Sequence, residues 1–180
     1  MLSALSFYQV NRSMAERLYQ KVGEYVRPEE KTILDLYCGA GTIGLSLAKK
    51  AKQIIGVEIV AEAVKDAKFN AKLNRIDNVR FILNDATLAA EELKKENIKL
   101  DAVILDPPRK GCTKELLNTV AKDFCPNELV YVSCDPATLA RDIKILRELG
   151  YSLKEYTPFD LFPRTHHVET AALFLRDINL

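Results

Sequence analysis

Short apolar runs alternate along this chain with longer segments in which apolar residues recur at the three- and four-residue spacing of a helix. The first such segment follows Ser13-x-x-Glu16, the pattern of a capping box, and stops at Arg27-Pro28. Later segments predict helices over residues 41–51, 60–74, 87–97, 113–123 and 136–150. The short runs predict strands over residues 32–37, 53–58, 78–83, 100–105, 128–133, 151–157 and 168–176.

This alternation predicts an α/β fold with a mostly parallel sheet and helices on both faces. A chain of 180 residues fits one domain, and no repeat, linker or low-complexity segment interrupts it. Because ligands of open α/β sheets bind outside the carboxyl ends of the strands, residues at those ends are expected to share one ligand-binding edge. Five polar or glycine residues lie at or just after predicted strand ends: Gly39, Glu58, Asp85, Asp106 and Cys134.

Composition narrows the class of protein. A net charge of +1 provides no overall field to attract nucleic acid, so a site for a polyanion must be local. The absence of a signal peptide or of a membrane-length apolar run predicts a cytoplasmic protein with reduced thiols and no membrane contact. The four cysteines are Cys38, Cys112, Cys125 and Cys134. Their spacing does not match that of metal ligands, so no metal site is expected.

A glycine-rich turn follows the first predicted strand. Gly39-x-Gly41-x-x-Gly44 satisfies the dinucleotide-binding pattern, and Glu58, 19 residues after Gly39, is placed to accept hydrogen bonds from ribose. The pattern alone does not separate NAD from S-adenosylmethionine, and a tight turn without a ligand is the structural alternative. Asp35 inside the strand and the helix before it favour S-adenosylmethionine.

Asp106-Pro107-Pro108-Arg109 follows another predicted strand, where two prolines make a rigid loop. Asp106 is then able to face a cofactor or a base, although a helix-capping loop is an equally good reading of this motif alone. The motif also resembles the Asp-Pro-Pro-Tyr of amino-group methyltransferases. Arg109 occupies the aromatic position, which weakens that alternative.

Cys134 lies in Ser133-Cys134-Asp135-Pro136, at the ligand edge and before a helix. A lone cysteine after an apolar strand is usually a small buried side chain. The helix N-terminus favours the thiolate, whereas Asp135 opposes it, so the sequence leaves the pKa of this thiol open. Cys38 is expected to pack under the glycine turn, and Cys112 and Cys125 are interpreted as structural.

Glu169 begins the apolar run of the last predicted strand, where a carboxylate is costly unless it is exposed or functional. Taken alone, a surface glutamate is the favoured interpretation. The neighbouring His166 and His167 are open to three readings: solvated loop residues, phosphate contacts or supports for Glu169.

Together with Ser6-Phe7-Tyr8-Gln9-Val10-Asn11, these motifs resemble the RNA 5-methyluridine methyltransferase family across nearly the whole chain. The resemblance implies a class I methyltransferase, Rossmann-like fold with seven strands, mostly parallel, and an antiparallel last strand. It implies one S-adenosylmethionine-dependent domain over residues 1–180, with an opening motif and leading helix in 1–27 and the core in 28–180. The cofactor-binding residues that it implies are Gln9, Tyr37, Gly39, Gly41, Thr42, Glu58, Asp85 and Asp106.

The resemblance also implies methylation of uridine C5 in transfer or ribosomal RNA. Cys134 would add to C6 of a flipped-out uridine, and Glu169 would remove the C5 proton. Four basic residues could contact RNA phosphates, and each is equally plausible as a solvated surface charge: Arg109, Lys110, Arg141 and Arg164.

Family members usually carry a preceding RNA-binding β-barrel, and some carry a cysteine cluster that holds an iron–sulfur cluster. This sequence has neither, so we expect a monomer without a cluster that binds RNA weakly and with steep salt dependence. Three alternatives remain open: a methyltransferase acting on another base or an amino group, a cofactor-binding module without autonomous RNA activity, and an NAD oxidoreductase.

Overall fold

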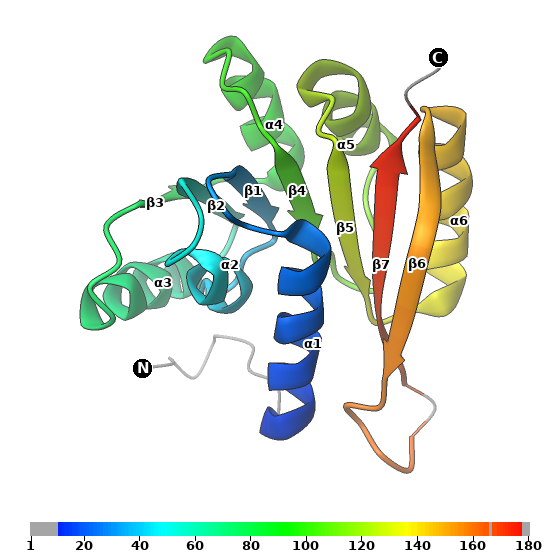
Figure 1. The fold of residues 1–180 in the computed structure, drawn as a ribbon, viewed down its shortest axis with the longest axis horizontal. Helices are drawn as coiled ribbons and strands as arrows, with labels where there is room; N and C mark the ends of the chain where they lie inside the picture. Colours follow the sequence, from blue (N-terminus) through cyan, green and yellow to red (C-terminus); the bar gives the residue numbers. More distant parts are fainter. Residues whose placement is uncertain (1–10, 166, 178–180) are drawn as a thin grey trace.

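The computed structural model describes residues 11–165 and 167–177 of the chain. At its centre is a seven-stranded sheet in the order β3-β2-β1-β4-β5-β7-β6 (Figure 1). The strands are β1 (Thr32–Leu36), β2 (Gln53–Glu58), β3 (Val79–Leu83), β4 (Ala102–Leu105), β5 (Glu128–Ser133), β6 (Tyr151–Phe159) and β7 (Glu169–Arg176). The helices are α1 (Arg12–Val26), α2 (Thr42–Leu47), α3 (Ala61–Leu73), α4 (Ala86–Lys95), α5 (Lys114–Asn118) and α6 (Pro136–Glu148), with a π-helical segment, Thr119–Phe124, after α5.

The sheet is parallel from β3 through β5, and β7 runs antiparallel to both of its neighbours, β5 and β6. Every predicted strand is present, with ends within two residues of those expected. The predicted class I methyltransferase fold, with seven strands and an antiparallel last strand, is therefore confirmed.

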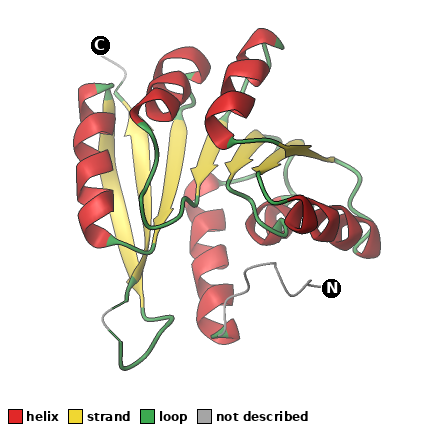
Figure 2. Ribbon diagram, turned by 180° about the vertical axis from the view of Figure 1, so that it is seen from behind, coloured by secondary structure: helices red, strands yellow, loops and turns green. Residues whose placement is uncertain are grey.

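Helices cover both faces of the sheet (Figure 2). One core lies beneath α4, α5 and α6 and includes Leu93, Leu116 and Leu146. The other lies beneath α1 and α2 and includes Leu18 and Ile43. Strands β1, β4 and β5 are buried along their whole length, which explains why most of their residues are apolar.

Strand β2 passes closely beneath the glycine turn. A Cβ atom at Gly56 would lie 2.9 Å from Cys38 Sγ and 2.7 Å from Phe81 Cδ1, so only glycine fits at this point of the strand. Cys38 is buried, and its predicted packing under the turn is confirmed.

The start of α1 differs from the prediction. Its N-cap is Asn11, whose side chain accepts a hydrogen bond from the N–H of Met14, so Ser13 does not cap the helix. Glu16 instead pairs with Arg12, 3.0 Å away on the next turn. Asn11 and Ser13 are both favourable capping residues, and the path of the chain selects the earlier one.

Two other helices differ from the prediction. α2 ends at Leu47, where the Lys50 N–H donates to the Leu47 carbonyl at 3.0 Å and the chain turns back toward β2. The helix predicted over 113–123 divides into α5 and the π-helical segment, which ends when Cys125 adopts a left-handed φ of 46°. Periodicity alone does not reveal where a helix must stop to let the chain re-enter the sheet.

Gly44 lies where α2 presses on β1 and β2, and a Cβ there would lie 2.8 Å from Asp35 Oδ2 and 2.9 Å from Ile54 Cγ2. We expect Gly44→Ala to lower the free energy of unfolding by about 1–3 kcal/mol through overpacking. Gly23→Ala is the matched control, because its Cβ would meet only the flexible end of Leu47, at 3.1 Å. Urea denaturation compares the two variants, and equal stability would contradict the packing argument.

Candidate active site at the carboxyl ends of the strands

The parallel strands end at one edge of the sheet, called here the carboxyl edge, where β7 begins. In Figure 1 the arrowheads of β4 and β5 point to it, and the loop between β6 and β7 lies there too. The predicted Gln9 and His166 lie outside the described residues. Six predicted site residues lie at or next to strand ends on this edge: Gly39, Glu58, Asp85, Asp106, Cys134 and Glu169.

Glu58 holds the glycine turn through backbone amides. Its Oε2 accepts from the Gly39 N–H at 2.9 Å, and its Oε1 accepts from the N–H groups of Ile59 and Val60, also at 2.9 Å. Gly39 and Gly41 have φ of 54° and 79°, a backbone conformation that favours glycine. Within residues 11–165 and 167–177, no atom lies within 4 Å of where a Gly39 Cβ would be, so these residues leave the backbone open to a ligand there.

Asp35 lies beneath the turn with only 1% of its surface exposed. Its Oδ2 accepts from the Gly44 N–H at 3.0 Å, whereas its Oδ1 has no hydrogen-bond partner among the described residues. Burial raises the pKa of Asp35 to about 7, opposed by the Gly44 N–H and reinforced by the charge of Glu58. A buried acceptor without a partner is costly unless it serves a ligand.

The other predicted cofactor residues surround the turn. Tyr37 is half-buried with a left-handed φ of 65°, and Thr42 begins α2. Asp85 is the N-cap of α4, and its Oδ1 accepts from Thr87 N–H at 2.8 Å and Leu88 N–H at 3.3 Å. Helix capping is therefore a structural role that the sequence prediction for Asp85 did not include.

Cys134 and Glu169 are brought together by the antiparallel pairing of β5 and β7. The last pair in register is Ser133 with Thr170, so Cys134 and Glu169 are the next residues at the end of this ladder. Glu169 is only 5% exposed, so the surface interpretation of this residue was wrong. Burial raises the pKa of Glu169, and the charge of Arg109 opposes that rise.

Cys134 is partly exposed, and its proton is held by its surroundings. Burial raises the pKa of its thiol, and the charges of Glu169 and Asp106 raise it further, while Arg109 lowers it. The net shift of the thiol pKa is therefore upward, opposite to the lowering that the helix N-terminus was expected to cause. The adjacent Asp135 uses its carboxylate to cap α6.

Asp106 belongs to a cluster of acids at the carboxyl edge. Burial raises its pKa well above the ordinary value, and the charges of Glu169, Asp35 and Glu58 add to the rise. Part of this cluster therefore carries a proton near neutral pH.

Arg109 bridges to the β6–β7 loop. Its Nη2 donates to His167 Nε2 at 3.1 Å, and because arginine has no acceptor, His167 accepts and carries its own proton on Nδ1. The His167 ring also packs edge-on against Phe162, with centroids 6.3 Å apart. Arg141, a predicted phosphate contact, donates instead to Asp142 within the fold, at 2.8 Å.

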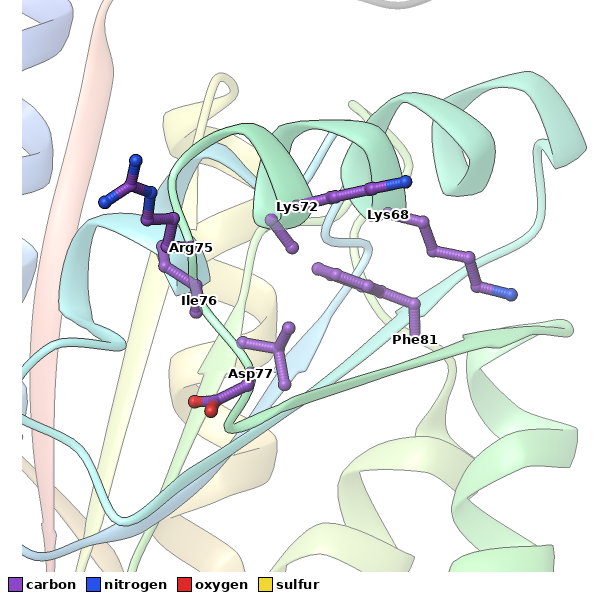
Figure 3. A pocket seen from close by; sticks show the side chains of 8 residues that line it. Lys68, Lys72, Arg75, Ile76, Asp77 and Phe81 are labelled. Carbon is purple, nitrogen blue, oxygen red and sulfur yellow. The ribbon is translucent and has the colours of Figure 1, made fainter.

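Two hollows lie away from the carboxyl edge. One hollow, of about 510 Å³, lies between α3 and β3 and is lined by residues that include Lys68, Lys72, Arg75 and Phe81 (Figure 3). The other, of about 530 Å³, lies between α1 and α2. Neither hollow is lined by a predicted site residue. The candidate active site is therefore identified by the polar side chains that meet at the carboxyl edge, and not by either hollow.

In residues 11–165 and 167–177, no three His, Cys, Asp or Glu side chains gather as metal ligands. No helix in the described part of the chain is both long and apolar enough to cross a membrane.

A family model for tRNA (uracil-5-)-methyltransferase matches residues 2–177. The chain belongs to this family. RNA methyltransferases of Clostridium tetani and Bacillus cereus are 50% and 49% identical to it, over 96% and 97% of this chain but only 37% and 38% of their own length. The chain thus spans less than two-fifths of the length of these relatives.

One solved structure agrees with this membership, and a second shows the fold alone. Pyrococcus abyssi tRNA (uracil-54, C5)-methyltransferase, in complex with S-adenosyl-L-homocysteine, superposes with a TM-score of 0.81 and 36% identity, covering 95% of this chain and 40% of that one. Precorrin-6y C5,15-methyltransferase of Geobacter metallireducens shares the fold, with a TM-score of 0.75 and 13% identity over 98% of this chain and 93% of its own.

The raised pKa of Asp35 predicts how the stability of the fold depends on pH. This pKa is about 7 in the folded chain and ~4 in an unfolded one, so the stability that Asp35 contributes is full below about pH 4 and is lost as pH rises to about 7. Asp35→Asn keeps an acceptor for the Gly44 N–H and cannot ionise. We expect it to be more stable than the unmodified chain at pH 8, by on the order of 2–4 kcal/mol, and to lose that advantage toward pH 4.

Urea denaturation across this pH range measures the effect. Asp160→Asn, which changes an exposed carboxylate, is the control and is expected to follow the unmodified chain. A stability difference for Asp35→Asn that stayed constant from pH 4 to pH 8 would contradict the buried, protonated aspartate.

Proposed function

We propose that this chain is an S-adenosylmethionine-dependent methyltransferase domain that methylates C5 of uridine in RNA through a covalent adduct with Cys134. The observation that carries the proposal is the placement of Cys134 beside Glu169 at the end of the β5–β7 ladder, on the same edge as the glycine turn. The description of the matching family supports transfer RNA as the substrate.

The residues around the glycine turn fit the cofactor. The open space at Gly39 admits a ligand against the backbone, and Glu58 is held by three amides with its carboxylate fixed toward the turn. The Oδ1 of Asp35, which has no hydrogen-bond partner among the described residues, fits a cationic or hydrogen-bond-donating ligand. The other residues proposed to line this site are Gln9, Tyr37, Gly41, Thr42, Asp85 and Asp106. When bound, the cofactor supplies an electrophilic methyl group on a sulfonium.

Cys134 would activate the target base. Uracil C5 is a poor nucleophile, and a bond from the Cys134 sulfur to C6 moves electron density to C5, which can then accept the methyl group. Burial and the charges of Glu169 and Asp106 raise the pKa of this thiol, whereas a backbone hydrogen bond and the charge of Arg109 lower it, so Arg109 is a side chain that favours the reactive thiolate.

Glu169 would complete the reaction. After methyl transfer, its carboxylate takes the proton from C5, the electrons re-form the C5–C6 double bond, and the bond between C6 and the Cys134 sulfur breaks. The raised pKa of Glu169 suits this role, because a base whose pKa lies nearer the working pH accepts a proton more readily.

The substrate follows from the same site. A uridine must leave its stack to reach a thiol at the sheet edge, so we propose a flipped-out base. Arg109, Lys110 and Arg164 are exposed and available to phosphates, whereas Arg141 is engaged within the fold. We further propose that residues 1–180 form one domain that acts as a monomer in the cytoplasm.

Removal of the Glu58 carboxylate is expected to weaken cofactor binding. Glu58→Ala loses the charged acceptor proposed for the ribose hydroxyls, at a cost on the order of 1–3 kcal/mol in binding free energy. Calorimetric titration with S-adenosylhomocysteine measures this cost. Glu148→Ala, an exposed glutamate at the far end of α6, is the control. Unchanged affinity in a folded Glu58→Ala would remove Glu58 from the cofactor site.

The two proposed catalytic residues are expected to fail in different ways. Cys134→Ser should abolish methylation and covalent attachment, because serine has no accessible anion near neutral pH. Glu169→Gln should allow addition and methyl transfer but block release, so that a protein–RNA adduct bearing the methyl group accumulates. RNA containing 5-fluorouridine should trap the same adduct on the unmodified chain, because fluorine cannot be removed as a proton.

Denaturing gels and peptide mass spectrometry locate the linkage. Cys125→Ser is the matched control, since Cys125 is also partly exposed but follows the π-helical segment and donates to the Ala121 carbonyl. Normal methylation by Cys134→Ser would overturn the covalent mechanism in favour of a methyltransferase that acts on an amino group.

A further inference from the structure

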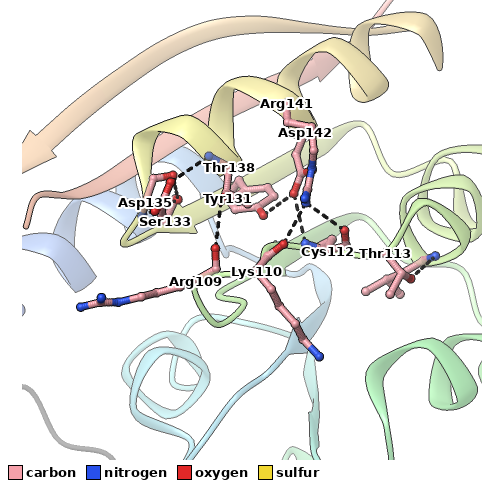
Figure 4. A network of polar contacts seen from close by, with 11 residues as sticks. Arg109, Lys110, Cys112, Thr113, Tyr131, Ser133, Asp135, Thr138, Arg141 and Asp142 are labelled. Carbon is pink, nitrogen blue, oxygen red and sulfur yellow. Dashed lines mark hydrogen bonds and ion pairs between the residues drawn. The ribbon is translucent and has the colours of Figure 1, made fainter.

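The loop that carries Arg109 is held by side chains of α6, the helix that follows Cys134 (Figure 4). Thr138 Oγ1 donates to the Arg109 carbonyl at 2.9 Å. Arg141 Nη2 donates to the Lys110 carbonyl at 2.9 Å and to the Cys112 carbonyl at 3.3 Å. These three hydrogen bonds tie the carbonyls of residues 109, 110 and 112 to side chains of α6.

Gly111 shows how closely the two segments approach. It has a left-handed φ of 73°, and a Cβ there would clash with Thr138 Cγ2 and lie 2.6 Å from Arg141 Nη2 and 2.7 Å from Asp142 Oδ2. The loop is therefore seated against α6 at a point where only a glycine fits.

Asp142 anchors the helix side of this contact. It is fully buried, and its Oδ2 accepts from the Tyr131 hydroxyl at 2.6 Å and from the Cys112 N–H at 3.1 Å. Its Oδ1 accepts from Arg141 at 2.8 Å. Buried charge is tolerated when its hydrogen bonds are satisfied, and a network satisfied in this way is rigid.

The loop directs the Arg109 side chain toward the reacting groups. Arg109 donates to His167, two residues before Glu169, and its charge lowers the pKa of both Glu169 and Cys134. Fixing the Arg109 side chain costs rotamer entropy, and a backbone that is already rigid avoids the additional entropy cost of ordering the loop.

We propose that Thr138, Arg141 and Asp142 are positioning residues that hold the 109–112 backbone so that the Arg109 guanidinium lies against His167 and beside Cys134 and Glu169. The catalytic part of this inference rests on the proposed function. The alternative is that the same contacts merely stabilise the fold.

The first test measures the reactivity of Cys134 and needs no RNA. Iodoacetamide alkylation of the full chain, followed by peptide mass spectrometry, compares Arg109→Ala, Thr138→Val and Arg141→Met. Each should slow alkylation of Cys134 by roughly two- to fivefold at pH 8, the effect of moving one partly screened cation away from the thiolate. The other charges facing this thiol, Glu169 and Asp106, stay in place.

Two controls accompany that test. Cys125, partly exposed at the other end of the sheet, should react at the same rate in every variant. Arg80→Met breaks a comparable surface pair, Arg80 with Glu96 at 2.6 Å, and should leave Cys134 unchanged. Unaltered or faster alkylation of Cys134 in Arg141→Met would overturn the proposal, since a merely structural contact would loosen the site and expose the thiol.

The second test is a double-mutant cycle on RNA methylation. If Arg141 acts through Arg109, Arg141→Met should lower kcat by roughly 5- to 50-fold alone and should cause almost no further loss in the Arg109→Ala background. Independent, multiplying losses would overturn the positioning role. Absence of methylation by the unmodified chain would count against the proposed function instead, and the alkylation rates would still decide whether α6 positions Arg109.

Discussion

The reversed direction of β7 between β5 and β6 decides which groups share the carboxyl edge. Parallel strands bring only their carboxyl ends to an edge, and here they supply Gly39, Asp106 and Cys134. β7 contributes its first residue to the same place. A parallel β7 of eight residues would carry Glu169 ~26 Å away, to the opposite edge, at the usual rise per residue. The pairing of thiol and carboxylate thus follows from one change of strand direction.

That arrangement concentrates acids. The charges of Glu169, Asp35 and Glu58 add to the rise in the pKa of Asp106, and burial raises the pKa of Asp35, Asp106 and Glu169. Such a cluster opposes folding, and proteins retain clusters of this kind at functional sites. It also favours a ligand that brings positive charge, as a sulfonium does. The negative charge of the acid cluster therefore complements the positive charge of the proposed cofactor.

Much of the fold could be predicted from the sequence, because strands buried on both faces are rich in apolar residues and are followed by glycine, acid or cysteine. The capping of α1 by Asn11 could not, since Ser13 is an equally good cap by residue type. Nor could the burial of Glu169, which depends on pairing with a distant strand. Arg141 and Asp142 resemble the ordinary charges of an amphipathic helix, and only the approach of Gly111 and Tyr131 shows what they bind.

The tight passage of β2 beneath the glycine turn has an evolutionary consequence. Gly56, Cys38 and Phe81 fill one small volume from three separate segments, and a single methyl group added at position 56 would overlap both of the other side chains. A larger residue at 56 is acceptable only if positions 38 and 81 shrink with it. These three positions should therefore covary among related chains, linking the sequence of the turn to that of an edge strand with which it shares no hydrogen bond in the described structure.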